Sequence, residues 1–562
     1  MSFSFFASPS PIPPPETKDA PTPNTEVSEE DPAEQAISVP DGSDTGEGGK
    51  LKMIISLVKK CLGVKDIATM RLSLPASLLE PIPNLEYWHY LDRPDLFAAI
   101  NDSEDPFDRM LAVLRFTFSK DLKFIRGKIC KPYNSVLGEH FRSHWDVIPV
   151  SYPGDTSQAP IQHLYLYPPA AESTYSSTLS ITSPRNGISE TASMKSARSG
   201  KSNRSGLSTL SKGCSTPGTP GKSTPATSPE LFETQLDADM SNLNLSASNS
   251  GDLIESDEVT PSEDRARVRV AFLTEQVSHH PPVSAFTAFC PSRHVELTGV
   301  DQISAKVSGT TVRVMPGSCN KGFFVRIHGG PGKGETYHAT HPVAAVNGIL
   351  RGSFYVTMGE STVITCSGSD GQNLRAIIEY KEESWLGRAH FLCEGVIHTY
   401  TPGESAYQDW TKVKHVPRSR VLATFDGSWK HLVKWKRVDD PDSAYSTLID
   451  LSTLHVIPKA VRPLEKQLST ESRKLWDNVT TRLLSKEYSE ATKHKLAIEQ
   501  KQRDDAAERK RKGIKFIPRY FDSNIDSGIP TLTDDGHKAL YEELGEEALH
   551  PLEDIPKDFG KV

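Results

Sequence analysis

A succession of short apolar runs after Arg265, separated by turn residues, constrains the fold more than any other feature of the sequence. The runs cover residues 268–272, 283–289, 295–300, 311–314, 323–327, 363–366, 376–380 and 391–398. Runs of this length, rich in β-branched and aromatic residues, are typical of antiparallel strands in a sheet or barrel. The Gly-rich segment 329–335 lacks the spacing of a phosphate-binding loop and predicts a hairpin loop.

Helical patterns lie on both sides of these runs. Residues 51–62 interleave apolar side chains with lysines at helical spacing and end at Gly63, and residues 110–118 are also helical in pattern. The sequence between Pro463 and Pro518 is charged, contains Ala and Leu and has no proline, which predicts further helices. We therefore expect a β-rich α+β fold. The helix at 51–62 either packs on the core or forms a mobile lid that touches membranes.

Two stretches have too few apolar residues to build a core, and we expect both to be disordered. Residues 1–50 are rich in proline and acidic residues, and residues 172–262 are dominated by Ser, Thr, Gly, Asn and Lys. Residues 71–171 look too short for an independent core. We therefore predict one domain, residues 51–171 and 263–560, interrupted by an insertion; the alternative is a linker between two domains.

Several Ser-Pro and Thr-Pro steps lie in the insertion and are candidate sites for proline-directed phosphorylation. The seven cysteines are scattered and never spaced as CxxC, which indicates neither a disulfide framework nor a zinc site. No apolar run approaches the roughly 20 residues that span a bilayer, and the N-terminus lacks the pattern of a signal peptide. We expect a cytosolic protein that meets membranes from outside.

The net charge of −8 disfavours wholesale attachment to nucleic acid or to an anionic membrane, so local patches must do any such binding. The first candidate site is His279-His280, followed by Pro281-Pro282. The two prolines stiffen this segment, and imidazoles held in place suit a phosphate. On an extended strand the two rings would point to opposite faces, which disfavours a shared metal. Two structural histidines at a strand end are the alternative.

The second candidate is a polar stripe on a predicted helix, with Lys495, Glu499 and Arg503 at positions i, i+4 and i+8. One interpretation is a ladder of surface ion pairs. The other is a ligand platform, in which the cations meet a phosphate and the carboxylate accepts hydrogen bonds from sugar hydroxyls.

The third candidate comprises Lys131 and Asn134 in the segment 131–139, which on local grounds is a turn after a basic stretch. Together the three segments supply cations, imidazoles and an amide. Their spacing in the sequence leaves open whether they converge in space.

The segment 275–285, EQVSHHPPVSA, resembles the signature of the oxysterol-binding-protein-related family, and the other two candidates resemble further motifs of that family. The resemblance covers residues 51 to 560 except the insertion and is to short, soluble, fungal-type members. It implies a nearly closed antiparallel β-barrel with a central lipid tunnel, an N-terminal lid with helices, and a C-terminal helical subdomain. It also implies that the chain is not an enzyme and needs neither cofactor nor metal.

By this resemblance, the residues of the three segments bind the headgroup of phosphatidylinositol 4-phosphate at the tunnel mouth. The 4-phosphate is assigned to His279, His280 and Arg503, and the rest of the headgroup to Lys131, Asn134, Lys495 and Glu499. The implied function is extraction of this lipid and its exchange for a second lipid, sterol or phosphatidylserine, between organelle membranes. The alternative is a lipid sensor or scaffold regulated through the insertion.

The sequence does not decide between sterol and phosphatidylserine as the second lipid. Residues 74–81 match neither the form of sterol-binding branches nor fully that of phosphatidylserine-transferring branches, although Leu78, Leu79 and Glu80 lean toward the latter. The resemblance implies a cytoplasmic protein that is peripheral on endoplasmic reticulum, Golgi or plasma-membrane contacts. It predicts transient contact with membranes and no nucleic-acid partner, and it leaves protein partners open.

Overall fold

The computed structural model describes residues 37–38, 47–68, 72–126, 131–153, 159–162, 267–349, 354–368, 373–383, 389–440 and 442–545. The predicted insertion, 172–262, lies outside these residues, as does most of the predicted N-terminal tail. Residues 163–167, whose sequence HLYLY has the pattern of a strand, also lie outside them.

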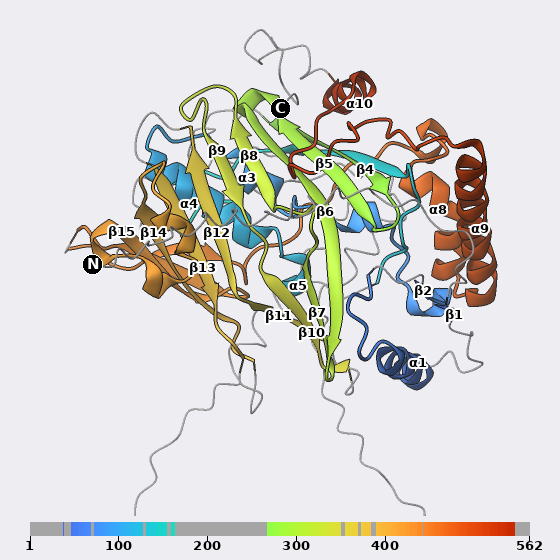
Figure 1. The fold of residues 1–562 in the computed structure, drawn as a ribbon. Coiled ribbons are helices and arrows are strands. Elements are labelled where there is room, and N and C mark those ends of the chain that lie inside the picture. The colour runs from blue at the N-terminus through green and yellow to red at the C-terminus, as the bar shows by residue number, and fades with distance from the viewer. Residues whose placement is uncertain are drawn as a thin grey trace, which may run out of the picture. The chain divides into compact units, whose positions relative to one another are not determined.

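A fifteen-stranded antiparallel sheet dominates the fold (Figure 1). Its strands are β3 (His140–Val147), β4 (Val268–Ser278), β5 (Val283–Cys290), β6 (Val295–Ser308), β7 (Thr311–Pro316), β8 (Phe323–Ile327), β9 (Thr336–Ala339), β10 (Val343–Asn347), β11 (Tyr355–Gly359), β12 (Ser361–Ser367), β13 (Leu374–Tyr380), β14 (Leu392–Thr399), β15 (Val421–Ser428), β16 (Leu432–Arg437) and β17 (Ser446–Asp450). Each predicted run coincides with one of these strands, and the run 391–398 begins one residue before β14. The Gly-rich segment joins β8 to β9, which pair antiparallel, as predicted.

The order of the strands is β3-β4-β5-β6-β8-β9-β12-β13-β14-β15-β16-β17, and the long β6 also carries a branch of β7, β10 and β11. The free edge of β3 meets the chain that follows β17. The backbones of His144 and Ala460 exchange hydrogen bonds of 3.0 and 2.8 Å, and Trp145 Nε1 donates to the Ile457 carbonyl at 3.1 Å. The two ends of the sheet are thus linked without direct strand pairing, which gives the predicted nearly closed barrel.

The α-helices are α1 (Glu47–Lys60), α2 (Asn84–Tyr87), α3 (Pro94–Ala98), α4 (Pro106–Ser119), α5 (Lys123–Arg126), α8 (Ser472–Leu484), α9 (Tyr488–Lys512) and α10 (Asp534–Leu544). The helical patterns at 51–62 and 110–118 lie in α1 and α4, and α1 begins at Glu47, before the pattern itself starts. A 3-10 turn, η1 (Ala76–Leu78), and a short parallel pair, β1 (Ile37–Ser38) with β2 (Leu72–Ser73), complete the N-terminal part.

The helix α4 is almost entirely buried, and its ends are fixed by polar contacts. The Asp105 carboxylate accepts a hydrogen bond from Phe107 N at 2.8 Å, which caps the first turn. Arg109 makes a two-point ion pair with Glu335, with distances of 2.8 and 2.6 Å, and Tyr337 donates to the same carboxylate at 2.8 Å. The buried charges of Arg109 and Glu335 are therefore paired with each other, as burial requires, and the helix is fixed to the β8–β9 hairpin.

Candidate functional site

The histidine pair lies in the turn between β4 and β5, because β4 ends at Ser278 and β5 begins at Val283. The rings of His279 and His280 are neighbours, with centroids 4.6 Å apart and planes at 66°, and the peptide bond between His280 and Pro281 is cis. The expectation that the rings point to opposite faces was wrong, since the pair follows the strand instead of continuing it. Both side chains are half-buried.

The residues that precede the histidines hold the turn in place. The buried Glu275 carboxylate accepts hydrogen bonds from the consecutive backbone N–H groups of residues 519–521, at 2.8, 2.7 and 3.3 Å. Gln276 donates from its side chain to the Ser278 carbonyl at 2.7 Å, and the Ser278 hydroxyl donates to the Pro281 carbonyl at 2.8 Å. These motif residues therefore have structural contacts that fix the turn in which the two imidazoles lie.

The loop 131–139 is hydrogen-bonded to β4 just before the histidine turn. Gly138 N donates to the Gln276 carbonyl at 2.9 Å, and Gln276 N donates to the Glu139 carbonyl at 2.8 Å. At the other end of the loop, the Lys131 ammonium donates to the Asn134 side-chain oxygen at 2.7 Å, and both residues are exposed. The structure therefore brings the first and third candidate segments to the same edge of the sheet.

Two buried side chains fix this loop on α8. The Glu139 carboxylate accepts hydrogen bonds from the Ser472 hydroxyl at 2.7 Å, from Trp476 Nε1 at 3.0 Å and from Val136 N at 3.0 Å. The Tyr133 ring packs on Trp476 with centroids 4.9 Å apart. Lys131 and Asn134 are thus carried by a loop whose apolar and acidic side chains are anchored in the protein.

The buried Glu139 should make stability depend on pH. Burial raises the pKa of this carboxyl group from 4.5 to about 7, although its three hydrogen bonds act in the opposite direction. The folded protein therefore binds the Glu139 proton more tightly than the unfolded chain does. The stability that the protonated Glu139 contributes is fully present below pH 4.5 and is lost as the pH rises to about 7.

We expect Glu139→Gln to flatten this dependence, because the neutral amide has nearly the same shape and cannot ionise. Unfolding by urea, followed across this pH range in the parent and the variant, measures the difference. Glu465→Gln, at an exposed position before α8, is the control that should leave the slope unchanged. Equal slopes in the parent and in Glu139→Gln would contradict the assignment.

The polar stripe on α9 divides into a buried and an exposed part. Lys495 is only 4% exposed, and its ammonium lies 2.5 Å from the Glu499 carboxylate. Arg503 is partly exposed and donates from Nε and Nη2 to the Gln500 side-chain oxygen at 3.2 and 3.1 Å. A ladder of surface ion pairs does not describe the stripe, since the lysine is inside the protein.

A small apolar cluster joins α8, α9, η1 and the loop. Its buried members include Tyr133, Trp476 and Ala491, and Ile498 of α9 packs against them. In addition, Ala76 N of η1 donates to the Thr492 hydroxyl at 3.2 Å. The loop is thus bonded to β4 on one side and packed through α8 on α9 on the other. The three candidate segments are therefore connected through β4, the loop and this cluster.

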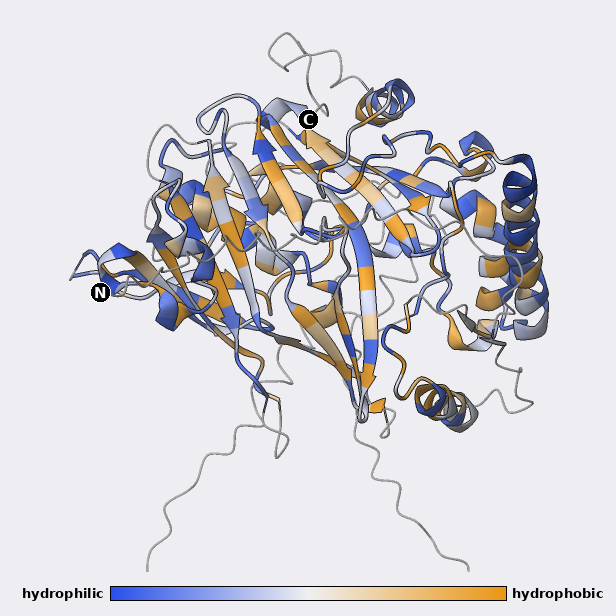
Figure 2. Cartoon of the chain, viewed as in Figure 1, coloured by the Kyte–Doolittle hydropathy of each residue, from blue (hydrophilic) through white to orange (hydrophobic). Residues whose placement is uncertain are grey.

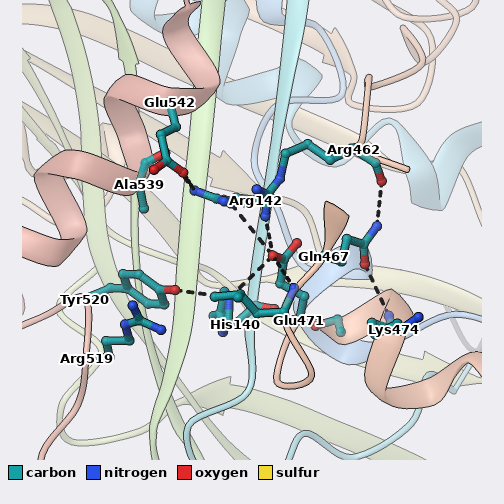
Figure 3. A network of polar contacts seen from close by, with 12 residues as sticks. His140, Arg142, Arg462, Gln467, Glu471, Lys474, Arg519, Tyr520, Ala539 and Glu542 are labelled. Atoms are coloured by element: carbon teal, nitrogen blue, oxygen red, sulfur yellow. Dashed lines mark hydrogen bonds and ion pairs between the residues drawn. The ribbon is translucent and has the colours of Figure 1, made fainter. Parts of the chain in front are cut away.

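Figure 3 shows a polar network where β3, the chain before α8, and α10 meet. Arg142 of β3 donates to the Glu542 carboxylate of α10 at 2.8 Å. Glu471, just before α8, accepts a hydrogen bond from Arg462 and lies 3.9 Å from His140 Nε2. Burial and the nearby Arg142 lower the pKa of His140 to about 3, so this histidine is neutral and structural. The network fixes the strand that follows the candidate loop.

Sequence reasoning missed the structural carboxylates Glu275, Glu139 and Glu471, all of which are at most 3% exposed. The signal that could have found Glu275 is a glutamate within an apolar strand pattern, since a buried carboxylate must have hydrogen-bond donors around it. Among the described residues, no group of three or more His, Cys, Asp or Glu side chains is arranged to hold a metal ion. None of the described helices has both the length and the apolar content needed to cross a membrane.

Comparisons with known proteins agree with this architecture. The model of the oxysterol-binding protein family matches residues 53–157 and 258–542. The chain is similar to oxysterol-binding protein-like protein 1 of Schizosaccharomyces pombe, with 38% identity over 90% of this chain and 93% of the relative. It is also similar to oxysterol-binding protein homolog 7 of Saccharomyces cerevisiae, with 29% identity over 44% of this chain and 52% of the relative.

A solved structure shares the fold. The Osh1 ORD domain in complex with cholesterol superposes with a TM-score of 0.51 at 17% sequence identity, over 90% of this chain and 91% of that domain. At this identity the match concerns the fold alone. Together with the family model, which covers most of the described sheet and helices, and the fission-yeast relative, it identifies the family. The chain belongs to the oxysterol-binding protein family of lipid-binding and lipid-transfer proteins.

Proposed function

We propose that the chain extracts phosphatidylinositol 4-phosphate from one membrane and exchanges it for a second lipid at another. The observation that carries this proposal is the connection of the three candidate segments. The loop with Lys131 and Asn134 is bonded to the strand that ends at His279 and His280, and it packs through Trp476 on the helix pair that bears the polar stripe.

The chemistry of the seven residues fits a phosphorylated sugar headgroup. Arg503, Lys131 and Lys495 supply cations, the two imidazoles can donate to a phosphate, and Asn134 and Glu499 can bind hydroxyl groups. Lipid extraction also requires that the acyl chains leave the bilayer, and each CH₂ kept out of water is worth roughly 0.8 kcal/mol. A tunnel inside the barrel would replace the bilayer, and neither covalent chemistry nor a cofactor is needed.

The second lipid is sterol or phosphatidylserine. The segment that differs between branches of the family, residues 74–81, includes Leu78, Leu79 and Glu80. It contains η1, which contacts α9 through Ala76 and Thr492. A substitution in this segment would therefore alter contacts with α9, the helix that carries the polar stripe. The partial likeness of residues 78–80 to phosphatidylserine-transferring branches makes this lipid the first to test.

We also propose that the insertion 172–262 interrupts a single lipid-binding domain. In support, β3 and β4 flank the insertion and are hydrogen-bonded neighbours along the length of β3, from His140 with Glu275 to Val147 with Val268. The residues on both sides of the insertion thus belong to one sheet. Two independent domains joined by a linker would not share a sheet in this way.

The helix α1 is proposed as the lid. The chain just after it is anchored on β6, since Ile67 N donates to the Ala305 carbonyl at 2.7 Å and the Asp66 carboxylate accepts from Ala305 N at 2.8 Å. A helix attached to the barrel at one end could close over lipid chains. We place the protein in the cytoplasm, peripheral to endoplasmic reticulum, Golgi or plasma-membrane contacts.

A two-vesicle assay tests the exchange. Donor vesicles contain phosphatidylinositol 4-phosphate, acceptor vesicles contain sterol or phosphatidylserine, and fluorescent reporters follow each lipid. Faster movement of the first lipid when the acceptor holds the second supports exchange. A chain that binds phosphatidylinositol 4-phosphate but moves no lipid would defeat the proposal and would favour the sensor or scaffold.

A further inference from the structure

Two isoleucines just after α9 face the solvent. Ile514 is 53% exposed and Ile517 is 81% exposed, which is the highest exposed fraction among the large apolar side chains that the structure describes. Single exposed apolar side chains are common. Two large ones within four residues form a small apolar patch, and its exposure to water is unfavourable.

Basic side chains surround this pair. Residues 509–519 contain six cations and no acidic residue: Arg509, Lys510, Arg511, Lys512, Lys515 and Arg519. Glu508 lies 2.7 Å from Lys512, Asp535 lies 2.8 Å from Arg519, and the Glu275 carboxylate lies against the backbone of residue 519. The end of α9 is correspondingly blue in Figure 2. Cations outnumber carboxylates here, although the whole chain carries a net charge of −8.

The exposed segment is held at both ends. Gly513 takes the left-handed conformation that ends the helix, with φ of 63°, and Ile514 N donates to the Arg509 carbonyl at 3.0 Å. At the other end, the Glu275 carboxylate binds Arg519 N at 2.8 Å. The isoleucines are therefore presented by an anchored piece of backbone.

Phe516, between the two isoleucines, faces the protein. A Cβ atom added to Gly138 would lie 3.3 Å from the Phe516 ring, so this ring packs directly on the candidate loop. The Arg509 guanidinium lies 5.8 Å from the same ring. Phe516 thus attaches the segment to the loop that carries Lys131 and Asn134.

A purely structural explanation accounts for part of this pattern. Cations in the last turn of a helix stabilise its negative end, which covers Arg509 to Lys512. It does not explain Lys515, which lies beyond the helix, or the exposure of the isoleucines, whereas Arg519, also beyond the helix, is paired with Asp535. Apolar side chains within a cationic surface are the combination that binds the interface of an anionic bilayer, where apolar groups enter the acyl boundary and cations meet the headgroups.

We propose that residues 509–519 form a docking surface for an anionic lipid bilayer. Arg503 lies nine residues before Lys512, or about 14 Å along the helix, and the loop with Lys131 contacts Phe516. Docking would therefore bring the candidate headgroup site close to the membrane. The docking itself does not rest on the proposed exchange function.

Vesicle cosedimentation with the full chain tests the docking surface. The vesicles contain phosphatidylcholine alone or with phosphatidylglycerol, an anionic lipid outside the candidate ligands, and no phosphoinositide. We expect binding only to the anionic vesicles, and weaker binding at higher salt. The double variant Ile514→Ser/Ile517→Ser should bind about tenfold more weakly or worse, and so should Lys510→Gln/Arg511→Gln/Lys515→Gln.

Matched controls remove the same side-chain types elsewhere on the surface. Leu392→Ser/Val438→Ser replaces two apolar side chains that are each 48% exposed, and Lys412→Gln/Lys414→Gln/Lys434→Gln neutralises three exposed lysines. Both should bind anionic vesicles like the parent. Equal binding by the patch variants and the controls would overturn the proposal and make an acidic protein surface the partner to seek. His279→Ala/His280→Ala should retain docking, which separates this result from failure of lipid extraction.

Discussion

Replacing His279 and His280 together by alanine is expected to reduce the extraction of phosphatidylinositol 4-phosphate by on the order of a hundredfold or more. The two rings lie 4.6 Å apart in a turn that Ser278 and Gln276 hold in place. Each hydrogen bond to a charged phosphate is worth about 1.5–3 kcal/mol, and a tenfold change corresponds to about 1.4 kcal/mol. Extraction from vesicles by the parent and the variant measures the loss.

A matched double variant controls for the removal of two histidines. His415 and His431 are both exposed and lie beside β13–β14 and between β15 and β16, several strands from β4, so His415→Ala/His431→Ala should extract like the parent. Because the signature histidines are half-buried, the melting temperature of both variants should also be measured. We expect it to change little in either variant. Normal extraction by the signature variant would remove the histidines from the site and reopen their interpretation as structural residues.

Local sequence pattern predicted the strands whose apolar side chains form uninterrupted runs, such as β4, β5 and β8. It missed the strands β3, β9, β10, β11, β15, β16 and β17. In β16 (Leu432–Arg437), for example, lysine and arginine alternate with Val433 and Trp435, so that only alternate side chains are buried. It could not predict how the barrel closes, because His144 pairs with Ala460, a contact between residues far apart in the sequence. Contacts of this kind depend on the topology of the whole sheet. The local spacing of apolar residues carries no information about them.

The candidate site was predictable to a similar degree. Motif resemblance selected the seven residues, and the i, i+4 spacing correctly predicted the ion pair between Lys495 and Glu499. The burial of Lys495 could not be predicted, because it depends on how α9 packs on α8 and η1. The orientation of the histidine rings was also predicted wrongly, since strand geometry was assumed for residues that form a turn.

The first residue of the signature, Glu275, is expected to contribute to stability rather than to ligand binding. We expect Glu275→Ala to lower the free energy of unfolding by about 3 kcal/mol, because it removes the acceptor for the N–H groups of residues 519–521 and leaves them without a partner. Urea unfolding followed by tryptophan fluorescence measures the change. Glu275→Gln keeps one acceptor oxygen and should lie between the parent and Glu275→Ala.

Hydrogen exchange distinguishes this role from a general loss of stability. The amides of residues 519–521 should exchange faster in Glu275→Ala than in the parent, whereas amides of the remote strands β13 and β14 should change only as far as global stability falls. Glu490→Ala, at an exposed position on α9, should shift stability by less than about 0.5 kcal/mol. Unchanged protection at residues 519–521 would show that another group holds this segment. Accelerated exchange would mean that Glu275 fixes the docking segment and the histidine turn together. Glu275 is bonded to residues 519–521, at the end of the docking segment, and lies on β4, which leads to the histidine turn.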